Sequence, residues 1–142
     1  MPYAETDKAD HQMSFYAATK KATEAMAHSY AHLYDLRVTM FRFFTVYGPW
    51  GRPDMALFKF VKAMLNGDAI DVYNHGKMRR DFTYIEDLIQ AIWRLAETRP
   101  GGAPVGDFDS LSPVAPFRIV NIGKAQTDTL GDFNEQIEQT HG

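Results

Sequence analysis

Cysteine, long apolar runs and an excess of positive charge are all missing from this sequence. The absence of cysteine excludes disulfides and thiolate metal sites. No apolar run approaches the roughly 20 residues that a membrane-spanning helix needs. The formal net charge of -3 argues against a general nucleic-acid or membrane-surface binder, because such proteins need net or clustered positive charge. These features are compatible with a cytoplasmic protein, and we expect that location.

Metal-ligand patterns are missing as well. The five histidines share no metal-ligand spacing, and no acidic residue stands between His28 and His32 as in zinc proteases. We therefore expect surface or helix-packing histidines and no metal site. The 142 residues suit one domain with a core of moderate size. Hydrophobic residues at 45% and charged residues at 23% are typical of an ordinary globular protein.

The stretch from Ser14 to Lys21 carries the first chemical signal. Tyr16 and Lys20 are four residues apart, so in a helix both side chains lie on one face, one turn apart. A free tyrosine is protonated at neutral pH and is a poor base. An ammonium group one turn away favours the phenolate, and the pair can then transfer protons. The same spacing also occurs on helix faces that are merely solvated, so the pair alone is a weak signal.

The stretch that contains this pair predicts a closely packed helix from Ser14 to Tyr34. Ser14 is a suitable N-cap, and six alanines would let the helix lie close to a sheet or another helix. Lys21 and Glu24 are expected on its solvated face.

Residues 37–47 predict a strand, since they are dense in β-branched and aromatic side chains. The run is apolar on both faces, which is typical of a buried strand in a parallel sheet. Arg42 interrupts it. A buried arginine needs partners, so Arg42 is either part of a structural ion pair or a site residue, and the ion pair is favoured because buried charges are usually paired.

Residues 48–55 break all periodicity with two glycines, two prolines, Trp50 and Arg52. This composition predicts a rigid, shaped loop. Open α/β sheets bind their ligands in loops that leave the carboxyl ends of buried strands, which makes this loop a candidate site. The alternative is an ordinary turn in which Trp50 covers the core.

The remaining chain alternates helical and strand patterns. Helices are expected at 56–66, 85–98 and 130–140, strands at 70–73 and 117–122, a turn at 74–77 and an irregular connection at 99–116. Gly67 is expected to end the helix at 56–66. The buried side of the helix at 85–98 is expected to comprise Leu88, Ile89, Ile92, Trp93, Leu95 and Ala96.

A basic turn precedes the helix at 85–98. Arg79 and Arg80 could hold a phosphate, to which a guanidinium bonds bidentately. Such a turn is more often solvated.

Longer motifs resemble a known family. Tyr16-Ala-Ala-Thr-Lys20 resembles the Tyr-x-x-x-Lys signature of the short-chain dehydrogenases/reductases. Residues 42–55, 72–87 and 112–123 resemble the extended branch of that superfamily, the NAD-dependent epimerase/dehydratase family. Within it they look most like UDP-glucuronate 4-epimerases of the capsular polysaccharide type. The resemblance covers nearly the whole chain and is weakest at 99–111 and after 123.

The resemblance implies an NAD-dependent epimerisation of UDP-glucuronate at C4 through a 4-keto sugar, giving UDP-galacturonate. It implies that Tyr16 is the catalytic base, and that Lys20 favours its phenolate and bonds the nicotinamide ribose. Thr45 and Arg52 are implied to contact the substrate carboxylate. A uronate would give Arg52 a bidentate partner that a neutral hexose lacks. The implied UDP contacts are Arg80 at the pyrophosphate and Val72 and Tyr73 beside the uracil.

The resemblance also implies what this chain does not contain. The family's Gly-x-x-Gly-x-x-Gly loop is absent, as is the catalytic Ser/Thr some two dozen residues before the tyrosine. We therefore expect part of a Rossmann-type α/β parallel sheet without its N-terminal βαβ unit. Residues 1–50 would be the remnant of the NAD-binding domain, and 51–142 the nucleotide-sugar-binding region. The isolated chain is expected to be inactive and prone to aggregate or oligomerise, and the full-length enzyme to be a homodimer.

Two alternatives stay open at this stage. A nucleotide-sugar dehydratase of the same superfamily would carry its distinguishing acidic residue upstream of the tyrosine. A non-catalytic fragment would only bind the UDP sugar or pack against a partner chain.

Overall fold

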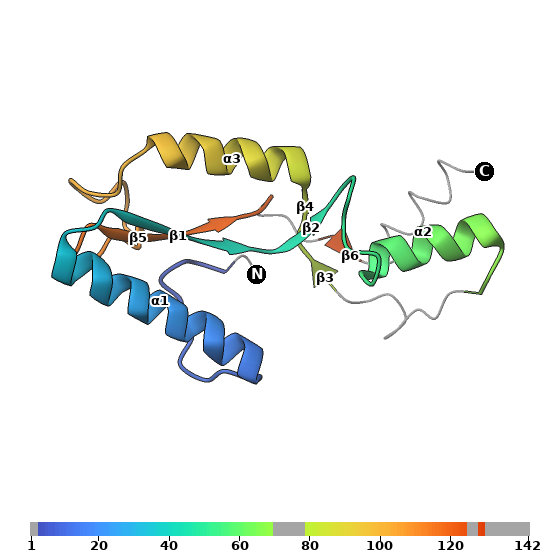
Figure 1. The fold of residues 1–142 in the computed structure, drawn as a ribbon, viewed down its shortest axis with the longest axis horizontal. Helices are drawn as coiled ribbons and strands as arrows, with labels where there is room; N and C mark the ends of the chain where they lie inside the picture. The colour runs from blue at the N-terminus through green and yellow to red at the C-terminus, as the bar shows by residue number, and fades with distance from the viewer. Residues whose placement is uncertain (1–2, 70–78, 125–127, 130–142) are drawn as a thin grey trace. The chain divides into compact units, whose positions relative to one another are not determined.

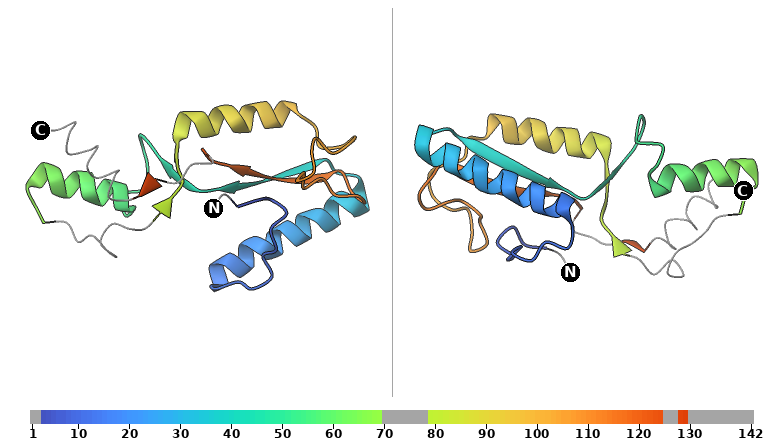
Figure 2. Two further views of the ribbon diagram at one scale, coloured as in Figure 1. Left: turned by 180° about the vertical axis from the view of Figure 1, so that it is seen from behind. Right: turned by 60° about the horizontal axis from the view of Figure 1, so that its bottom comes forward.

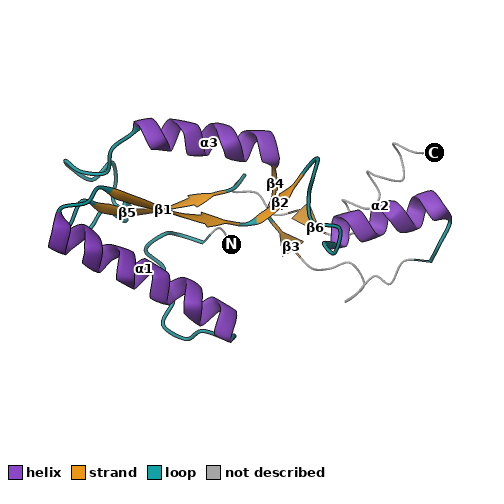
Figure 3. Ribbon diagram, viewed as in Figure 1, coloured by secondary structure: helices purple, strands orange, loops and turns teal. Residues whose placement is uncertain are grey.

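The computed structural model describes residues 3–69, 79–124 and 128–129. In chain order, its elements are α1 (Phe15–Tyr34), β1 (Val38–Phe43), β2 (Thr45–Tyr47), α2 (Ala56–Asn66), β3 (Arg79–Arg80), β4 (Phe82–Tyr84), α3 (Ile85–Glu97), β5 (Phe117–Ile122) and β6 (Asp128–Thr129). Figure 3 shows these helices and strands separated by loops. The predicted strand at 70–73, turn at 74–77 and helix at 130–140 lie outside the described residues.

The chain divides into two compact units. We call residues 3–42 with 91–122 the helix unit, and the described residues among 43–90 and 123–129 the loop unit. The chain passes between the units at residues 42–43, at residues 90–91 within α3, and at residues 122–123. The division at residue 50 that the resemblance implies stays a prediction.

Helix α1 forms where the sequence predicts it. The Ser14 hydroxyl oxygen accepts a hydrogen bond from the Ala17 backbone N–H at 3.1 Å, which confirms Ser14 as the N-cap. Ala31 is fully buried against Ala115 and Phe117. A methyl side chain at this position lets the helix backbone lie close to β5, as the alanine content predicts.

Strands β1 and β5 pair with each other in the helix unit. Helix α1 runs along one side of this strand pair and the C-terminal half of α3 along the other (Figures 1 and 2). Helices over both faces of paired strands give the α/β architecture expected from the sequence.

The predicted strand at 37–47 forms two strands instead of one. β1 pairs with β5, whereas β2 pairs with β4 in parallel, with Thr45 opposite Phe82 and Tyr47 opposite Tyr84. The break falls at Phe44 because the run changes its pairing partner there. The side chains of both strands are half-buried or more exposed, so the expectation of a strand buried on both faces is wrong for the described chain.

The loop unit has a small aromatic core. Phe60 of α2 and Phe82 of β4 are buried, and Tyr47 packs against them. Helix α2 ends at Gly67, whose φ of 72° is left-handed and which confirms the predicted C-cap. Strand β3 pairs antiparallel with β6, and Arg80 lies opposite Asp128.

Helix α3 buries less than its sequence predicts. Leu88 is buried, but Ile89 is 55% and Trp93 69% exposed. Residues 85, 88, 91, 92 and 95 form one helical stripe, and only that stripe is covered. Positions 89, 93 and 96 lie on the adjacent stripe, so the prediction that they are buried is wrong.

The described part of the chain has no helix long and apolar enough to cross a membrane. Nor does it bring three or more histidine, aspartate or glutamate side chains together in an arrangement that could hold a metal ion.

Candidate active site

Tyr16 and Lys20 lie in the first two turns of α1, on the same face of the helix. The Lys20 ammonium nitrogen lies over the Tyr16 ring, 5.2 Å from its centroid. This contact confirms the juxtaposition that the spacing predicts, and it is within the range of a cation–π interaction. The Tyr16 residue is 71% exposed, so its ring is accessible to a ligand.

The face of α1 that carries this pair is also its packed face. At 100° per residue, Tyr16, Lys20, Glu24, Ala27 and Ala31 fall within an arc of about 80°. Ala31 is buried at the C-terminal end of this arc, and Ala27 packs beside it. The phenol and the ammonium group therefore continue, at the N-terminal end, the side of the helix that contacts β1 and β5.

A bidentate ion pair holds α1 on β1. The Arg42 Nε donates to Glu24 Oε1 at 2.6 Å, and its Nη2 donates to Glu24 Oε2 at 2.8 Å. The pair confirms the structural role favoured for Arg42. The sequence predicts Glu24 on a solvated face. That prediction is wrong, because the Glu24 side chain is only 12% exposed. The Arg42 hydrogen bond holds the pKa of Glu24 below its ordinary value, against the opposing effect of burial.

The same arginine fixes the segment that precedes α1. Its Nη1 donates to the Glu5 carbonyl oxygen at 3.3 Å, and the Glu5 carboxylate accepts from the Asn121 backbone N–H at 2.9 Å. The Asn121 side-chain amide donates to the Tyr3 carbonyl oxygen at 2.8 Å. These bonds tie residues 3–5 to the end of β5.

His28 packs α1 against the connection before β5. Its Nε2 lies 2.8 Å from the Ser112 hydroxyl oxygen, and its ring meets Phe117 edge-on at 5.1 Å between centroids. His32 contacts the Val114 carbonyl oxygen through Nδ1 at 2.7 Å. Both side chains confirm the expected helix-packing role.

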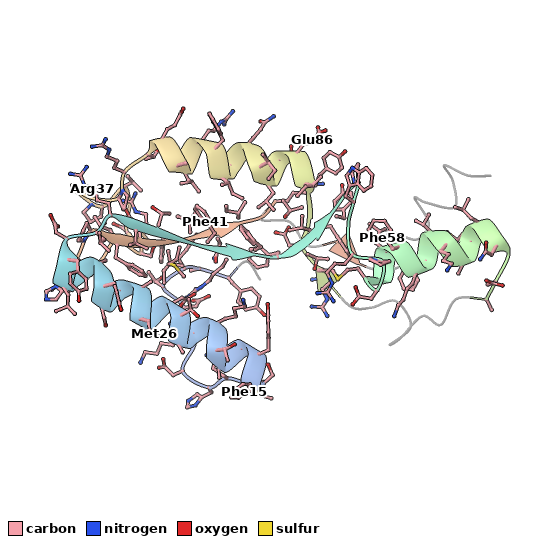
Figure 4. All side chains as sticks on the ribbon, viewed as in Figure 1. Phe15, Met26, Arg37, Phe41, Phe58 and Glu86 are labelled. Atoms are coloured by element: carbon pink, nitrogen blue, oxygen red, sulfur yellow. The ribbon has the colours of Figure 1, made fainter. Side chains whose placement is uncertain are left out.

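The loop after β2 has little room for side chains at its two glycines. Gly48 has φ of +142°, and a Cβ there would lie 2.4 Å from Ile85 Cγ2. A Cβ on Gly51 would lie 2.3 Å from the ring of Phe58, which lies in the first turn of α2 (Figure 4). Glycine is therefore required at Gly48, where the backbone angle and the contact both exclude a side chain, whereas a side chain at Gly51 would have to displace the Phe58 ring. Trp50 has φ of 63° and is fully exposed, so the alternative in which it covers the core is wrong.

Arg52 is paired within this loop. Its Nε donates to Asp54 Oδ1 at 3.0 Å, and its Nη2 donates to Asp54 Oδ2. The Arg52 side chain is 75% exposed and that of Asp54 is 59% exposed. The guanidinium thus lies at the surface, already in the bidentate geometry that a carboxylate ligand requires.

Thr45 and Arg80 are brought close by the strand pairing. The Thr45 backbone N–H donates to the Asp81 carbonyl oxygen at 3.0 Å, and Arg80 directly precedes Asp81. Arg80 is exposed. Val72 and Tyr73, the two residues expected beside the uracil, lie outside the described residues.

Sequence reasoning missed Asp81. Its Oδ1 accepts from the Lys124 backbone N–H at 3.1 Å and from the Thr83 hydroxyl at 3.2 Å. A Cβ on Gly123 would lie 2.6 Å from Asp81 Oδ2 and 2.6 Å from Phe44 Cδ2. Asp81 therefore joins β4 to the segment after β5. The only signal in the sequence is its position between the basic turn and an aromatic strand.

Asp54 was missed too, although a signal was present. It stands two residues after an arginine across a proline, a spacing at which a turn brings the two side chains together.

Comparison with known proteins identifies the family. The NAD dependent epimerase/dehydratase family matches residues 1–123. The chain belongs to this family. A probable UDP-glucuronate 4-epimerase of Rhizobium meliloti is 57% identical over 146 residues, which cover 100% of this chain and 43% of that protein. The chain therefore spans less than half the length of this curated relative of the epimerase/dehydratase family.

Solved structures of nucleotide-sugar epimerases share the fold. A UDP-N-acetylglucosamine 4-epimerase from Methanobrevibacter ruminantium, in complex with UDP-N-acetylmuramic acid, is 26% identical with a TM-score of 0.78, covering 98% of this chain and 41% of that one. A UDP-glucuronic acid 4-epimerase from Bacillus cereus, in complex with NAD, is 28% identical with a TM-score of 0.76, covering 94% and 39%. These matches confirm the Rossmann-type α/β class predicted for this epimerase/dehydratase chain.

Proposed function

We propose that this chain is part of an NAD-dependent UDP-glucuronate 4-epimerase, which interconverts UDP-glucuronate and UDP-galacturonate. The observation that carries the proposal is the Tyr16–Lys20 pair, one turn apart and accessible, on the side of α1 that faces the strands. The similarity to the R. meliloti protein supports UDP-glucuronate as the substrate. We propose that the chain corresponds to the C-terminal part of such an enzyme.

In this mechanism Tyr16 holds and moves the proton of the sugar O4. Its phenolate accepts that proton as the 4-keto sugar forms and returns it when the C4 hydroxyl forms again. Lys20 stabilises the phenolate by its charge. The Glu24–Arg42 pair positions both groups because it fixes the middle of α1 on β1. Rigid placement of a proton-transfer group keeps it within reach of the reacting atom.

The residues of this chain fit one part of the NAD site. The Lys20 ammonium is an accessible donor and the Tyr16 phenolate an accessible acceptor on one helix face, suited to the hydroxyls of a nicotinamide ribose. NAD, when bound, supplies a site that takes a hydride from the sugar C4 and gives it back. The sequence carries no glycine-rich loop for its pyrophosphate, so this chain would contribute only the ribose contacts.

The loop unit would bind the UDP sugar. Arg52 would hold the uronate carboxylate bidentately, and Thr45 would contact the same group. Arg80 would neutralise the pyrophosphate. Val72 and Tyr73 beside the uracil complete the proposed site. The expected cytoplasmic location and homodimer belong to the same proposal, and fractionation of cells and sedimentation of the enzyme test them.

The test uses a full-length form in which this chain follows the N-terminal part of the R. meliloti relative. Tyr16→Phe removes the titrating hydroxyl, and we expect turnover of UDP-glucuronate to fall by about 10²–10⁴-fold with an unchanged circular dichroism spectrum. Tyr30→Phe is the matched control, since Tyr30 is an exposed tyrosine of the same helix. Retained turnover in Tyr16→Phe would reject the assignment.

Product analysis separates this proposal from its rivals. The full-length form, incubated with NAD and UDP-glucuronate, should yield UDP-galacturonate of unchanged mass. A dehydratase would instead release a product lighter by one water. The isolated chain should show no turnover in the same assay. Binding of UDP sugars by the full-length form without any turnover would favour the non-catalytic alternative.

A further inference from the structure

The Arg52 guanidinium already holds a carboxylate of its own loop. Asp54 accepts from Nε and Nη2, the two donors along one edge of the guanidinium. That edge is the one a planar carboxylate ligand uses when it binds an arginine bidentately. Asp54 therefore stands in for the chemical group that the proposed substrate would present.

The loop is built to form this pair. Pro53 separates the two residues, and the Met55 backbone N–H donates to the Arg52 carbonyl oxygen at 3.2 Å, which closes a turn. Proline at the second position of such a turn presets its backbone angle. Because the two side chains leave the same turn, the pair forms with little loss of chain entropy.

We propose that Asp54 is an internal competitor for the substrate carboxylate and sets the selectivity of the site between uronates and neutral hexoses. A second carboxylate that binds the same edge of Arg52 must displace Asp54. A neutral sugar does not compete for that edge. This inference rests on the proposed function, in which Arg52 binds the uronate.

Charge strengthens the competition. The hydrogen bond from Arg52 holds the pKa of Asp54 below its ordinary value, so the group is a carboxylate at neutral pH. When displaced, it leaves a negative charge near the incoming uronate, and like charges repel. Displacement and repulsion both weaken uronate binding, and neither acts on a neutral hexose.

The expected effect is modest because the pair is exposed. Exposed ion pairs contribute little, and their loss changes an equilibrium by at most about fivefold. We therefore expect Asp54→Asn, which keeps the shape and removes the charge, to tighten UDP-glucuronate binding by about two- to fivefold.

Calorimetric titration of the full-length form with UDP-glucuronate and with UDP-glucose tests the inference. Asp54→Asn should lower the Kd for UDP-glucuronate and leave that for UDP-glucose unchanged. Asp68→Asn, another exposed aspartate of the loop unit, is the matched control and should change neither. An unchanged or raised Kd for UDP-glucuronate in Asp54→Asn, or an equal change for both sugars, would overturn the inference.

Arg52→Ala separates this inference from the proposed function. If Arg52→Ala weakens both sugars equally, or the wild-type form does not bind UDP-glucuronate, the proposed function fails. If Arg52→Ala selectively weakens UDP-glucuronate but Asp54→Asn has no effect, only the inference fails. In an Arg52→Ala background, Asp54→Asn should tighten binding by less than it does in the wild type, since only repulsion is left to relieve and displacement needs both residues. Tightening by the same factor without Arg52 would show that Asp54 acts by repulsion alone, and would overturn the competition.

Discussion

Two of the arginine–carboxylate pairs among the described residues use the same chemistry in different surroundings. Arg42 and Glu24 are 18 residues apart, and their side chains are 26% and 12% exposed. Arg52 and Asp54 are two residues apart, and their side chains are 75% and 59% exposed. Both pairs are bidentate. One joins a helix to a strand, and the other joins two positions of a single turn.

The difference decides what each pair can do. An enclosed pair cannot lose one partner without leaving a charge away from water, so Arg42 is committed to Glu24. An exposed pair exchanges its partner for water or for another carboxylate at little cost, which suits the ligand contact proposed for Arg52. The contrast agrees with the structural role of Arg42 and with the recognition role proposed for Arg52.

The largest expected loss of stability comes from a change at Gly48, where the loop that carries Arg52 begins. Gly48→Ala forces a Cβ to within 2.4 Å of Ile85 Cγ2 at a φ of +142°. Strain and overpacking together should destabilise the full-length form by about 3 kcal/mol. Gly106→Ala is the control, because nothing lies within 4 Å of a Cβ there. Urea denaturation measures both variants. Similar urea midpoints for Gly48→Ala and Gly106→Ala would mean that the contact between Gly48 and Ile85 does not hold the loop in place.

A somewhat smaller loss tests the enclosed pair directly. Arg42→Met leaves the Glu24 carboxylate without its guanidinium, at an expected cost of about 2 kcal/mol. Arg52→Met should leave the urea midpoint unchanged. Amide exchange in α1 should accelerate only in Arg42→Met, since the pair holds that helix on β1. Equal losses of stability in the two variants would remove the contrast between the pairs.

The smallest effect is the response to acid. Because the folded pKa of Glu24 lies below its ordinary value of 4.5, the stability from its charge is present above that value. It is lost as pH falls further, through the folded pKa. Glu24→Gln should therefore be less stable than wild type at neutral pH and should flatten the decline below about pH 4.5. Asp54→Asn should leave the decline nearly as in wild type. A steep decline that survives in Glu24→Gln would assign the acid sensitivity to other carboxylates.

Local chemistry was predictable from the sequence. The Ser14 cap, the Gly67 stop and the one-turn spacing of Tyr16 and Lys20 each depend on residues within one or two helical turns. Their outcomes agree with prediction because no distant partner is involved.

Features that depend on distant partners were harder to predict. The strand run divides at Phe44 because two different strands pair with its two parts. Glu24 was assigned to solvent because its partner lies 18 residues away on β1. Ile89 and Trp93 were expected to be buried because a helical pattern shows which side is apolar, but not how wide a stripe its neighbours cover.

The exposed indole at residue 50 gives the Arg52 loop its own optical signal. The chain has two tryptophans, and the second, Trp93, lies on α3. With Trp93 replaced by phenylalanine, fluorescence from this chain would come from a single ring two positions before Arg52. A fully solvated indole emits at long wavelength and is readily quenched by iodide, so a ligand that covers the ring would shift the emission and protect it.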